Sequence, residues 1–214
     1  MYRKVIIFCI AMCLGLSASA QKWAVSANAG DFLTFGTLNV SGQFAFSRHF
    51  SLDASVRYNP WIFNNGKLNQ FNYRHQTYSL GVKYWPWFIY SGFWVSLKGQ
   101  YQEYSRTLLN FNLGHASEKA TTGVDGKKYS QLEQGDAFGG VATLGYTFMI
   151  TKWFNVDLGV GGWAGYTKYK TYDRSNAARC TTCGRRTDAD TKAPASGKMF
   201  LLPNELVVSA MFVF

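Results

Sequence analysis

The sequence predicts an all-β fold: a closed antiparallel barrel of eight strands that crosses a membrane. Three observations predict it. Segments of about ten residues alternate between apolar and polar side chains, and the connections between them alternate between short and long. Aromatic residues make up 17% of the chain and gather at the segment ends. No apolar stretch of 18 residues follows residue 20, so transmembrane helices are not expected.

The first 20 residues have the parts of a secretory signal peptide. Residues 1–4 include the basic Arg3 and Lys4, residues 5–16 are apolar, and the stretch ends on Ser17-Ala18-Ser19-Ala20. The apolar run is too short for a membrane anchor, which needs roughly 20 residues. We therefore expect cleavage after Ala20 and export of a single domain, residues 21–214, to the outer membrane. Loss of two basic residues lowers the formal net charge from +10 to +8.

Alternation defines the expected strands, and residues 153–166 show it best. Residues 50–59 behave in the same way: Leu52 and Val56 would face lipid there, while Asp53, Ser55 and Arg57 would face the lumen. The other expected strands are residues 23–30, 38–47, 77–84, 93–102, 138–148 and 200–214. An even number of strands is the rule for single-chain bacterial barrels, and closure removes unpaired strand edges.

The connections divide into two classes. The short ones are residues 48–49, 86–92 and 151–152, and the others are residues 31–37, 59–72, 106–135 and 167–198. Short periplasmic turns and longer outer loops are typical of outer-membrane barrels, so both chain ends are expected on the periplasmic side. The aromatic residues at the two ends are interpreted as belts at the two membrane interfaces. The short-turn set is Trp85, Trp87, Phe88, Tyr90, Phe93, Phe148, Trp153 and Phe154; the long-loop set is Tyr58, Trp61, Phe63, Tyr73, Tyr101, Tyr104, Phe138, Tyr166 and Tyr169.

The C-terminal strand carries a resemblance. It ends on Phe214, with Phe212 and alternate apolar residues on the same face. This resembles the assembly signal that outer-membrane proteins present to the barrel-assembly machinery, which implies insertion by that machinery. Together with the segments 52–58, 83–86 and 153–161, the layout resembles small outer-membrane barrel families of Bacteroidota, OmpA- and OmpW-like in architecture, one of them a family of unknown function. The resemblance implies a fold and a location and supplies no activity.

The predicted lumen contains a polar cluster. Its charged members are Asp53, Arg57, Lys83, Lys98, Asp157 and Glu205. An eight-stranded barrel is only wide enough for side chains to fill, and buried charges must pair or stay hydrated. The favoured interpretation is therefore a plug of salt bridges. The alternative is a narrow, gated, porin-like channel that opens when an ion pair rearranges.

The last long connection carries two further features. Cys180 and Cys183 are predicted to form a local disulfide; a zinc site would need about four ligands, of which His115 could supply a third. No cofactor or metal is predicted. The connection is also basic, with Lys168, Lys170, Arg174, Arg179, Arg185, Arg186, Lys192 and Lys198 against three acidic residues. This charge indicates either a solvated loop or attraction to lipid, lipopolysaccharide, polysaccharide or a surface protein; nucleic acid is not expected for an exported chain.

Catalytic residues are sparse. His49, His75 and His115 are expected in a turn, near a strand end and in a loop, none beside a serine and an acid in a lumen pocket. Glu133 and Asp136 are a possible pair of loop carboxylates. We therefore expect a structural or interaction protein and no enzyme. A membrane-embedded hydrolase or acyltransferase that modifies lipids is the third alternative.

Overall fold

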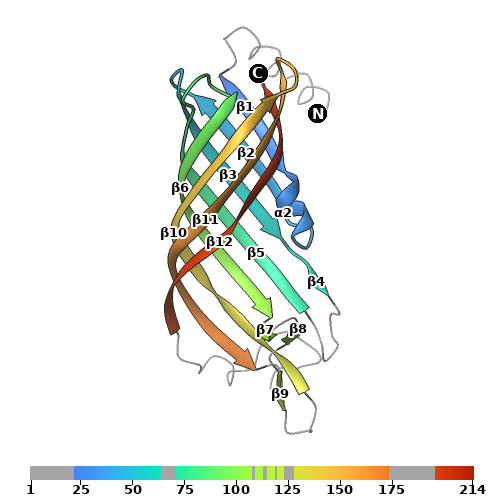
Figure 1. Ribbon diagram of the computed structural model, residues 1–214. Helices are drawn as coiled ribbons and strands as arrows, with labels where there is room; N and C mark the ends of the chain where they lie inside the picture. The colour runs from blue at the N-terminus through green and yellow to red at the C-terminus, as the bar shows by residue number, and fades with distance from the viewer. Residues whose placement is uncertain are drawn as a thin grey trace, which may run out of the picture.

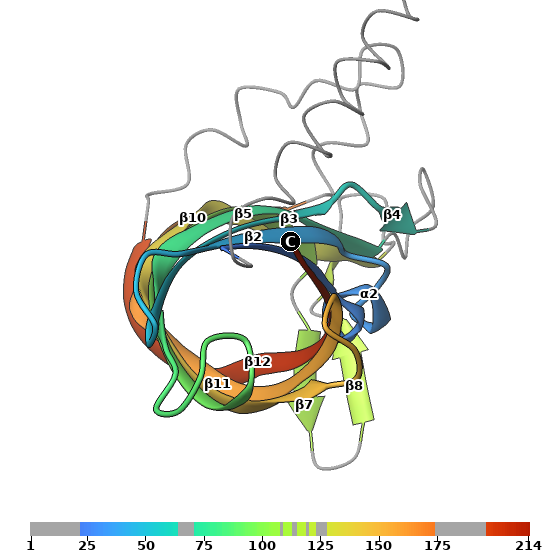
Figure 2. The same ribbon diagram turned by 90° about the horizontal axis from the view of Figure 1, so that it is seen from above.

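The computed structural model describes residues 22–63, 71–107, 109–112, 115–118, 120–122, 128–173 and 196–214. Within these residues, eight long strands close into a ring, each antiparallel to both neighbours (Figure 2). In ring order they are β1 (Trp23–Asn28), β2 (Leu38–Ala45), β3 (Phe50–Asn59), β5 (Phe71–Tyr84), β6 (Gly92–Thr107), β10 (Lys128–Met149), β11 (Phe154–Asp173) and β12 (Ser196–Val213), and β12 pairs with β1. The predicted eight-stranded antiparallel barrel is confirmed.

The predicted alternation holds along the strands. On β3, Ser51, Asp53 and Ser55 are buried inside the ring, whereas Leu52 and Val56 are each 42% exposed on the outside. The same register places the large apolar side chains of the other strands outward. Among the described residues, no helix is long and apolar enough to cross a membrane.

The two ends of the barrel differ. The turns at residues 46–49, 85–91 and 150–153 lie at one end, together with the C-terminus and the start of β1 (Figure 1). This is called the turn end below. The opposite end carries the short elements β4 (Ile62–Phe63), β7 (Leu109–Asn112), β8 (His115–Glu118) and β9 (Ala120–Thr122), and α2 (Ala29–Leu33) lies beside the barrel wall between the two ends (Figure 1). The opposite end is called the far end.

Several strands run further toward the far end than predicted. β5 begins at Phe71, β6 ends at Thr107, β10 begins at Lys128 and β11 ends at Asp173, so the expected loops 59–72, 106–135 and 167–198 are partly strand. The hydrophobic alternation stops earlier than the ladder does. Beyond the apolar belt the outward residues become polar, at Gln76, Glu103, Asp136 and Lys168, so the period of two disappears from the sequence while the backbone pairing continues.

The first strand is shorter than predicted. It ends at Asn28, not at Gly30, because the Asn28 side chain caps α2 by accepting a hydrogen bond from the Gly30 backbone N–H at 3.0 Å. Asparagine favours this capping position over the interior of a strand. The expected loop 31–37 therefore contains the end of a short helix.

Candidate functional site: a closed lumen with an outer chamber

The outer face of the barrel carries a continuous apolar belt. Toward the turn end its aromatic rings touch one another, as in the pairs Phe50–Tyr84 and Phe93–Tyr146. Toward the far end it finishes on outward residues that pair across neighbouring strands: Tyr78, Tyr101, Phe138 and Tyr166. The next outward residues on the same strands are polar: Gln76, Glu103, Asp136 and Lys168. On β6 the belt runs from Phe93 to Tyr101, a height of about 20 Å at usual strand rise and tilt.

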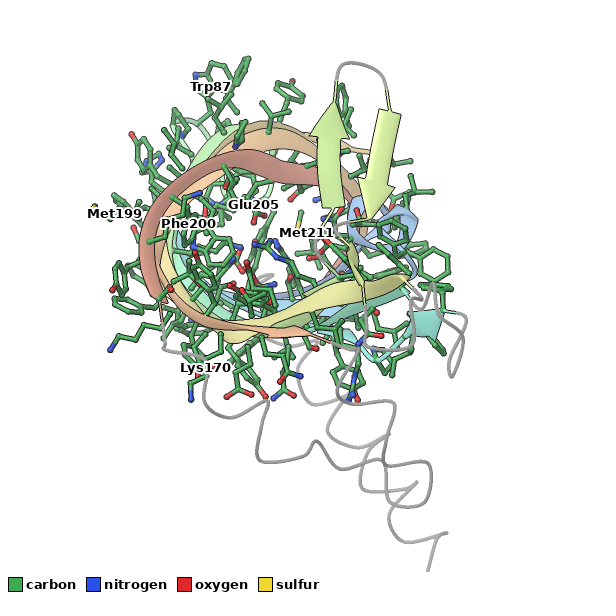
Figure 3. All side chains as sticks on the ribbon, turned by 90° about the horizontal axis from the view of Figure 1, so that it is seen from below. Trp87, Lys170, Met199, Phe200, Glu205 and Met211 are labelled. Atoms are coloured by element: carbon green, nitrogen blue, oxygen red, sulfur yellow. The ribbon has the colours of Figure 1, made fainter. Side chains whose placement is uncertain are left out.

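The inner face brings the six predicted lumen charges together as three ion pairs. The guanidinium of Arg57 donates to both carboxylate oxygens of Glu205, at 3.0 and 2.5 Å. The other pairs join the ammonium of Lys83 to Asp157 at 2.7 Å and that of Lys98 to Asp53 at 2.9 Å. Figure 3 shows Glu205 inside the ring. Every positive group of the predicted cluster thus has a negative partner, as buried charges require.

One member of this network was missed by sequence reasoning. Asp31 lies on α2 and its carboxylate contacts the Nε of Arg57 at 3.1 Å. Asp31 was expected in a loop, because the predicted first strand ends at Gly30 and the connection 31–37 follows it. Burial raises the pKa of the Asp31 carboxyl, and the positive charge of Arg57 opposes part of this rise.

An aromatic seal closes the lumen at the turn end. Trp85 and Tyr90 are buried, and the turn that carries them leans across the mouth of the ring (Figure 2, green). The Lys83 ammonium lies 3.8 Å from the ring centroid of Trp94 and 4.5 Å from that of Trp85. Assigning Trp85 and Tyr90 to the outer belt was therefore wrong. The turn folds inward, so strand-end position alone does not give the direction of its side chains.

The seal is held by specific hydrogen bonds. The Trp85 indole N–H donates to the Ser51 hydroxyl at 3.2 Å, and the Tyr90 hydroxyl donates to the Lys22 carbonyl at 3.0 Å. Tyr90 has a φ of +59°, a left-handed conformation that is strained for a residue with a bulky side chain. Asn155 donates to the Tyr90 carbonyl at 2.9 Å and holds this conformation in place.

Two glycines make room for Trp94, the third aromatic ring of the seal. Gly145 on β10 and Gly159 on β11 pair across the ladder. A Cβ atom on Gly145 would lie 2.4 Å from the Trp94 ring, and one on Gly159 would lie 2.7 Å from it. The inward face of this pair must therefore lack side chains for Trp94 to lie flat against the wall.

The remaining lumen space is divided into two parts. An inner cavity of about 50 Å³ is lined by polar residues that include Lys98, Ser96 and Gln43. An outer chamber of about 140 Å³ lies toward the far end. Arg57, Glu205, Asp31 and Gln100 line both, so the Arg57–Glu205 ion pair forms the partition together with Asp31 and Gln100. The inner cavity has room for only a few water molecules, at about 10–15 Å³ of accessible volume each.

A second polar cluster lies on the inner face near the outer chamber. Arg106 on β6 donates to Glu133 on β10 at 2.7 Å, and the Tyr104 hydroxyl donates to the same carboxylate at 2.9 Å. Tyr104 therefore points inward and does not belong to the outer belt. Glu133 is buried whereas Asp136 is exposed on the opposite face, so the two do not form a carboxylate pair. Both lie on β10, not in a loop.

The histidines are placed apart. The His49 ring Nδ1 lies 2.9 Å from the Trp85 carbonyl oxygen at the turn end. His75 lines the outer chamber, which sequence reasoning did not anticipate, and its ring meets Tyr73 edge to face. In the described part of the chamber lining, the hydroxyl residues are threonines and tyrosines and none is a serine. The side chain of His115 lies outside what the structure describes.

Part of the predicted basic loop belongs to strands. Lys168 and Lys170 lie on β11 and Lys198 on β12, where Lys198 pairs with Thr167. Figure 3 shows Lys170 outside the ring. Arg174, Arg179, Arg185, Arg186, Lys192 and the predicted disulfide residues Cys180 and Cys183 lie outside the described residues. Within the described residues, no group of three or more His, Cys, Asp or Glu side chains could hold a metal ion.

A family model covers nearly the whole chain. It is described as "Protein of unknown function (DUF3575)" and matches residues 5–206. The chain belongs to this family. No curated protein and no solved structure matches the chain. The sealed lumen and the outer chamber are therefore features of a DUF3575 member.

This DUF3575 member closes its ring at the C-terminus. The Phe214 backbone N–H donates to the Trp23 carbonyl at 2.8 Å, and the Trp23 N–H donates to the Phe214 carbonyl at 3.3 Å. The Phe212 ring lies outside and packs against the rings of Trp153 and Phe154, which also contact each other. Trp153 is exposed in the turn, at the short-turn end where it was predicted. The residues predicted as an assembly signal, Phe212 and Phe214, thus lie at the seam between the first and last strands.

Proposed function

We propose that this protein is an outer-membrane barrel whose lumen does not conduct and whose role is to bind a partner at its outer rim. The turn end would face the periplasm and the far end the exterior. The likeness to small barrels of Bacteroidota, OmpA- and OmpW-like in architecture, belongs to this proposal and is supported by the closed eight-stranded ring.

The observation that carries the membrane location is the inverted distribution of side chains. Large apolar residues cover the outside, and Ser, Thr, Asn, Asp and Lys residues are buried inside. Water-soluble proteins bury their large apolar side chains instead. The height of the belt is close to the apolar band of outer-membrane barrels, about 25 Å.

A pair of substitutions tests this location. Leu97 is 67% exposed in the middle of the belt. In a bilayer, Leu97→Arg should destabilise the barrel by about 2–4 kcal/mol, measured by urea unfolding in phosphatidylcholine vesicles. Gln76→Arg, also outward but beyond the belt, is the matched control and should change stability by less than about 1 kcal/mol. If Leu97→Arg left the stability unchanged, this face would be in contact with water.

The closed lumen supports a non-conducting role. The three ion pairs cross the bore, the aromatic seal closes one end, and the inner cavity of about 50 Å³ is small. The narrow gated channel remains the alternative candidate. It is favoured by one observation, namely that the two polar spaces are separated by few side chains, Asp31, Arg57, Gln100 and Glu205, with the Arg57–Glu205 ion pair among them. Conductance measurements distinguish the two.

The proposed partners follow from the outer rim. β10, β11 and β12 extend furthest at the far end, and Lys168, Lys170 and Lys198 lie on the extended parts. Positive side chains there favour the anionic groups of lipopolysaccharide, a surface polysaccharide or an acidic surface protein. The barrel-assembly machinery is proposed as the partner during biogenesis. A lipid-modifying hydrolase or acyltransferase finds less support, because no hydrogen bond joins the His75 ring to a hydroxyl group in the described chamber lining, as an activated nucleophile would need.

A further inference from the structure

The register of the barrel leaves its last strand without a neighbour over much of its length. Followed once around the ring, the pairing runs from Val25 through Gly42, Ala54, Leu80, Gly99, Gly140 and Ala164 to Leu201. The direct partner of Val25 on β12 is Phe212. The strands are thus staggered by 11 residues along β12 in one circuit. To cover β12, β1 would have to continue well past its actual end.

Instead, β1 stops after six residues and side-chain contacts extend the seam only slightly. Its pairing with β12 ends at Asn28 and Ser209. Beyond this point the Asn28 side-chain amide takes the place of backbone pairing. It donates to the Leu206 carbonyl at 2.9 Å and accepts from the Val208 N–H at 2.8 Å. The helix α2 packs here so closely that a Cβ on Gly30 would lie 2.9 Å from the Leu206 carbonyl oxygen. In the described residues, no strand pairs with residues 196–206 on this side.

This bare edge is protected against strand addition. A bulge interrupts the pairing of β12 with β11 between Gly161 and Trp163, opposite Pro203. Bulges and prolines are the devices by which edge strands avoid pairing with another chain. An added β-strand is therefore a poor occupant of the opening between β12 and α2. The outward side chains beside it are large and apolar, with Leu33 at 84%, Leu201 at 76% and Met199 at 81% exposure, and Figure 3 shows Met199 outside the ring.

The outer chamber lies directly behind the opening. Asp31 of α2 and both Leu202 and Glu205 of β12 line it, so its wall is formed from the two sides of the opening. Two buried donors in its lining have no partner among the described residues: the indole N–H of Trp163, 4% exposed, and the hydroxyl of Thr77. An unpaired buried donor is costly, and an indole N–H can be satisfied only by an acceptor.

One arginine of the lining keeps a free donor toward the chamber. Arg57 is paired with both Asp31 and Glu205. Arg106 binds Glu133 through its Nε and Nη2 atoms, and its half-exposed guanidinium still has the N–H groups of Nη1 to offer to an anion. The volume of about 140 Å³ suits a small head group and not a whole lipid. Apolar surface continues from the chamber through Phe200, which packs against Trp163, and Leu202.

We propose that the outer chamber binds the carboxylate head of a fatty acid whose chain enters from the membrane through the opening between β12 and α2. The carboxylate accepts hydrogen bonds from Trp163 and Thr77 and is attracted by Arg106. The chain passes Leu202 toward the apolar outer face at Leu201. This inference rests on the proposed membrane location, because only there does the opening face lipid.

Quenching of tryptophan fluorescence by dibromostearate tests the proposal. The protein is refolded into non-ionic detergent micelles and its folded state is checked by heat-modifiable migration in gels. Dibromostearate should quench wild-type fluorescence saturably, and Trp163→Phe should remove the saturable part. Arg106→Gln should weaken the apparent affinity about tenfold, the effect of one lost charge-assisted hydrogen bond. Gly140→Ala, outward with no atom closer than 4.0 Å to the new Cβ, should bind like wild type.

Three outcomes would overturn the proposal. Equal quenching by the brominated alcohol of the same chain length would show that no carboxylate is recognised. Full competition by acetate would assign the chamber to a free anion without lateral entry. Absence of saturable quenching in a heat-modifiable barrel would remove the fatty-acid site and leave the outer-membrane proposal intact. Loss of heat-modifiability in the wild-type protein would instead count against the membrane barrel itself.

Discussion

The carboxylate of Glu205 on β12 binds the guanidinium of Arg57 on β3 through two parallel hydrogen bonds that cross the lumen. The two strands are not neighbours in the ring, so the pair ties opposite parts of the wall together. Because Glu205 is 5% exposed and the pair lies between the inner cavity and the outer chamber, it is both a structural tie and part of the partition. Asp31 holds the third nitrogen of Arg57.

Removal of one partner of this pair should destabilise the barrel strongly. Arg57→Ala leaves Glu205 buried without its counter-charge, which typically costs about 3–5 kcal/mol. Urea unfolding in lipid vesicles measures the change. The double variant Arg57→Met with Glu205→Met should recover much of this loss, since no charge is then left alone. If the single and double variants were equally destabilised, packing and not charge would account for the effect.

Small residues behind Trp94 should be essential for the aromatic seal. Gly159→Ala places a Cβ 2.7 Å from the Trp94 ring and should destabilise the barrel by about 1–3 kcal/mol through overpacking. Gly42→Ala adds a methyl group with no atom within 4 Å and serves as the control. Trp94→Ala on top of Gly159→Ala should remove the additional penalty. Equal effects of the two glycine substitutions would contradict the role assigned to the ring.

The lysines at the far end should govern attachment to anionic surfaces. Replacing Lys168, Lys170 and Lys198 with Gln should weaken binding to lipopolysaccharide-containing surfaces by about 1 kcal/mol for each charge near the surface. Surface plasmon resonance on lipopolysaccharide vesicles, read at low and high salt, measures the change. Lys22→Gln with Arg48→Gln at the turn end is the control and should bind like wild type. Unchanged binding by the triple variant would assign the attachment to residues 174–195 in place of these three lysines.

The C-terminal residue should matter more for assembly than for stability. Phe214→Ala keeps both backbone hydrogen bonds to Trp23, so unfolding in vesicles should change by less than about 1 kcal/mol. The amount of folded barrel in the outer-membrane fraction of cells should fall several-fold, because the proposed assembly signal is lost. Phe214→Tyr is the conservative control. Equal accumulation of Phe214→Ala and wild type would remove Phe214 from the assembly signal.

Sequence periodicity predicted the barrel and the direction of the lumen charges, because a strand with one apolar face fixes the register of every residue on it. It could not predict the partners of those charges. Arg57 meets Glu205 across the ring, and that contact depends on closure and stagger, which no local pattern records. The position of Asp31 was not predicted for a related reason. It lies on α2, a five-residue helix that is held by its cap and by β12 and is too short to show a helical period in the sequence.

Turns and strand extensions were the weakest predictions. Trp85 and Tyr90 looked like interface aromatics because they follow a strand, yet the turn bends inward and buries them. Glu133 looked like a loop residue because its surroundings are polar on both faces. In the structure it continues β10 and pairs with Arg106. Where both faces of a segment are polar, its composition does not show whether it is a strand or a loop.

The measurement that tests the central claim most directly is the conductance of the purified, refolded protein in planar lipid bilayers. The closed lumen predicts no discrete openings from a correctly folded, heat-modifiable barrel, in wild type and in Leu97→Val, a conservative change on the outer belt. Arg57→Ala, measured in parallel, removes the ion pair from the partition between the two polar spaces and leaves the aromatic seal in place, so it too should stay silent. Discrete openings of the wild-type protein that change in size or frequency with Arg57→Ala would contradict the account and establish the gated channel.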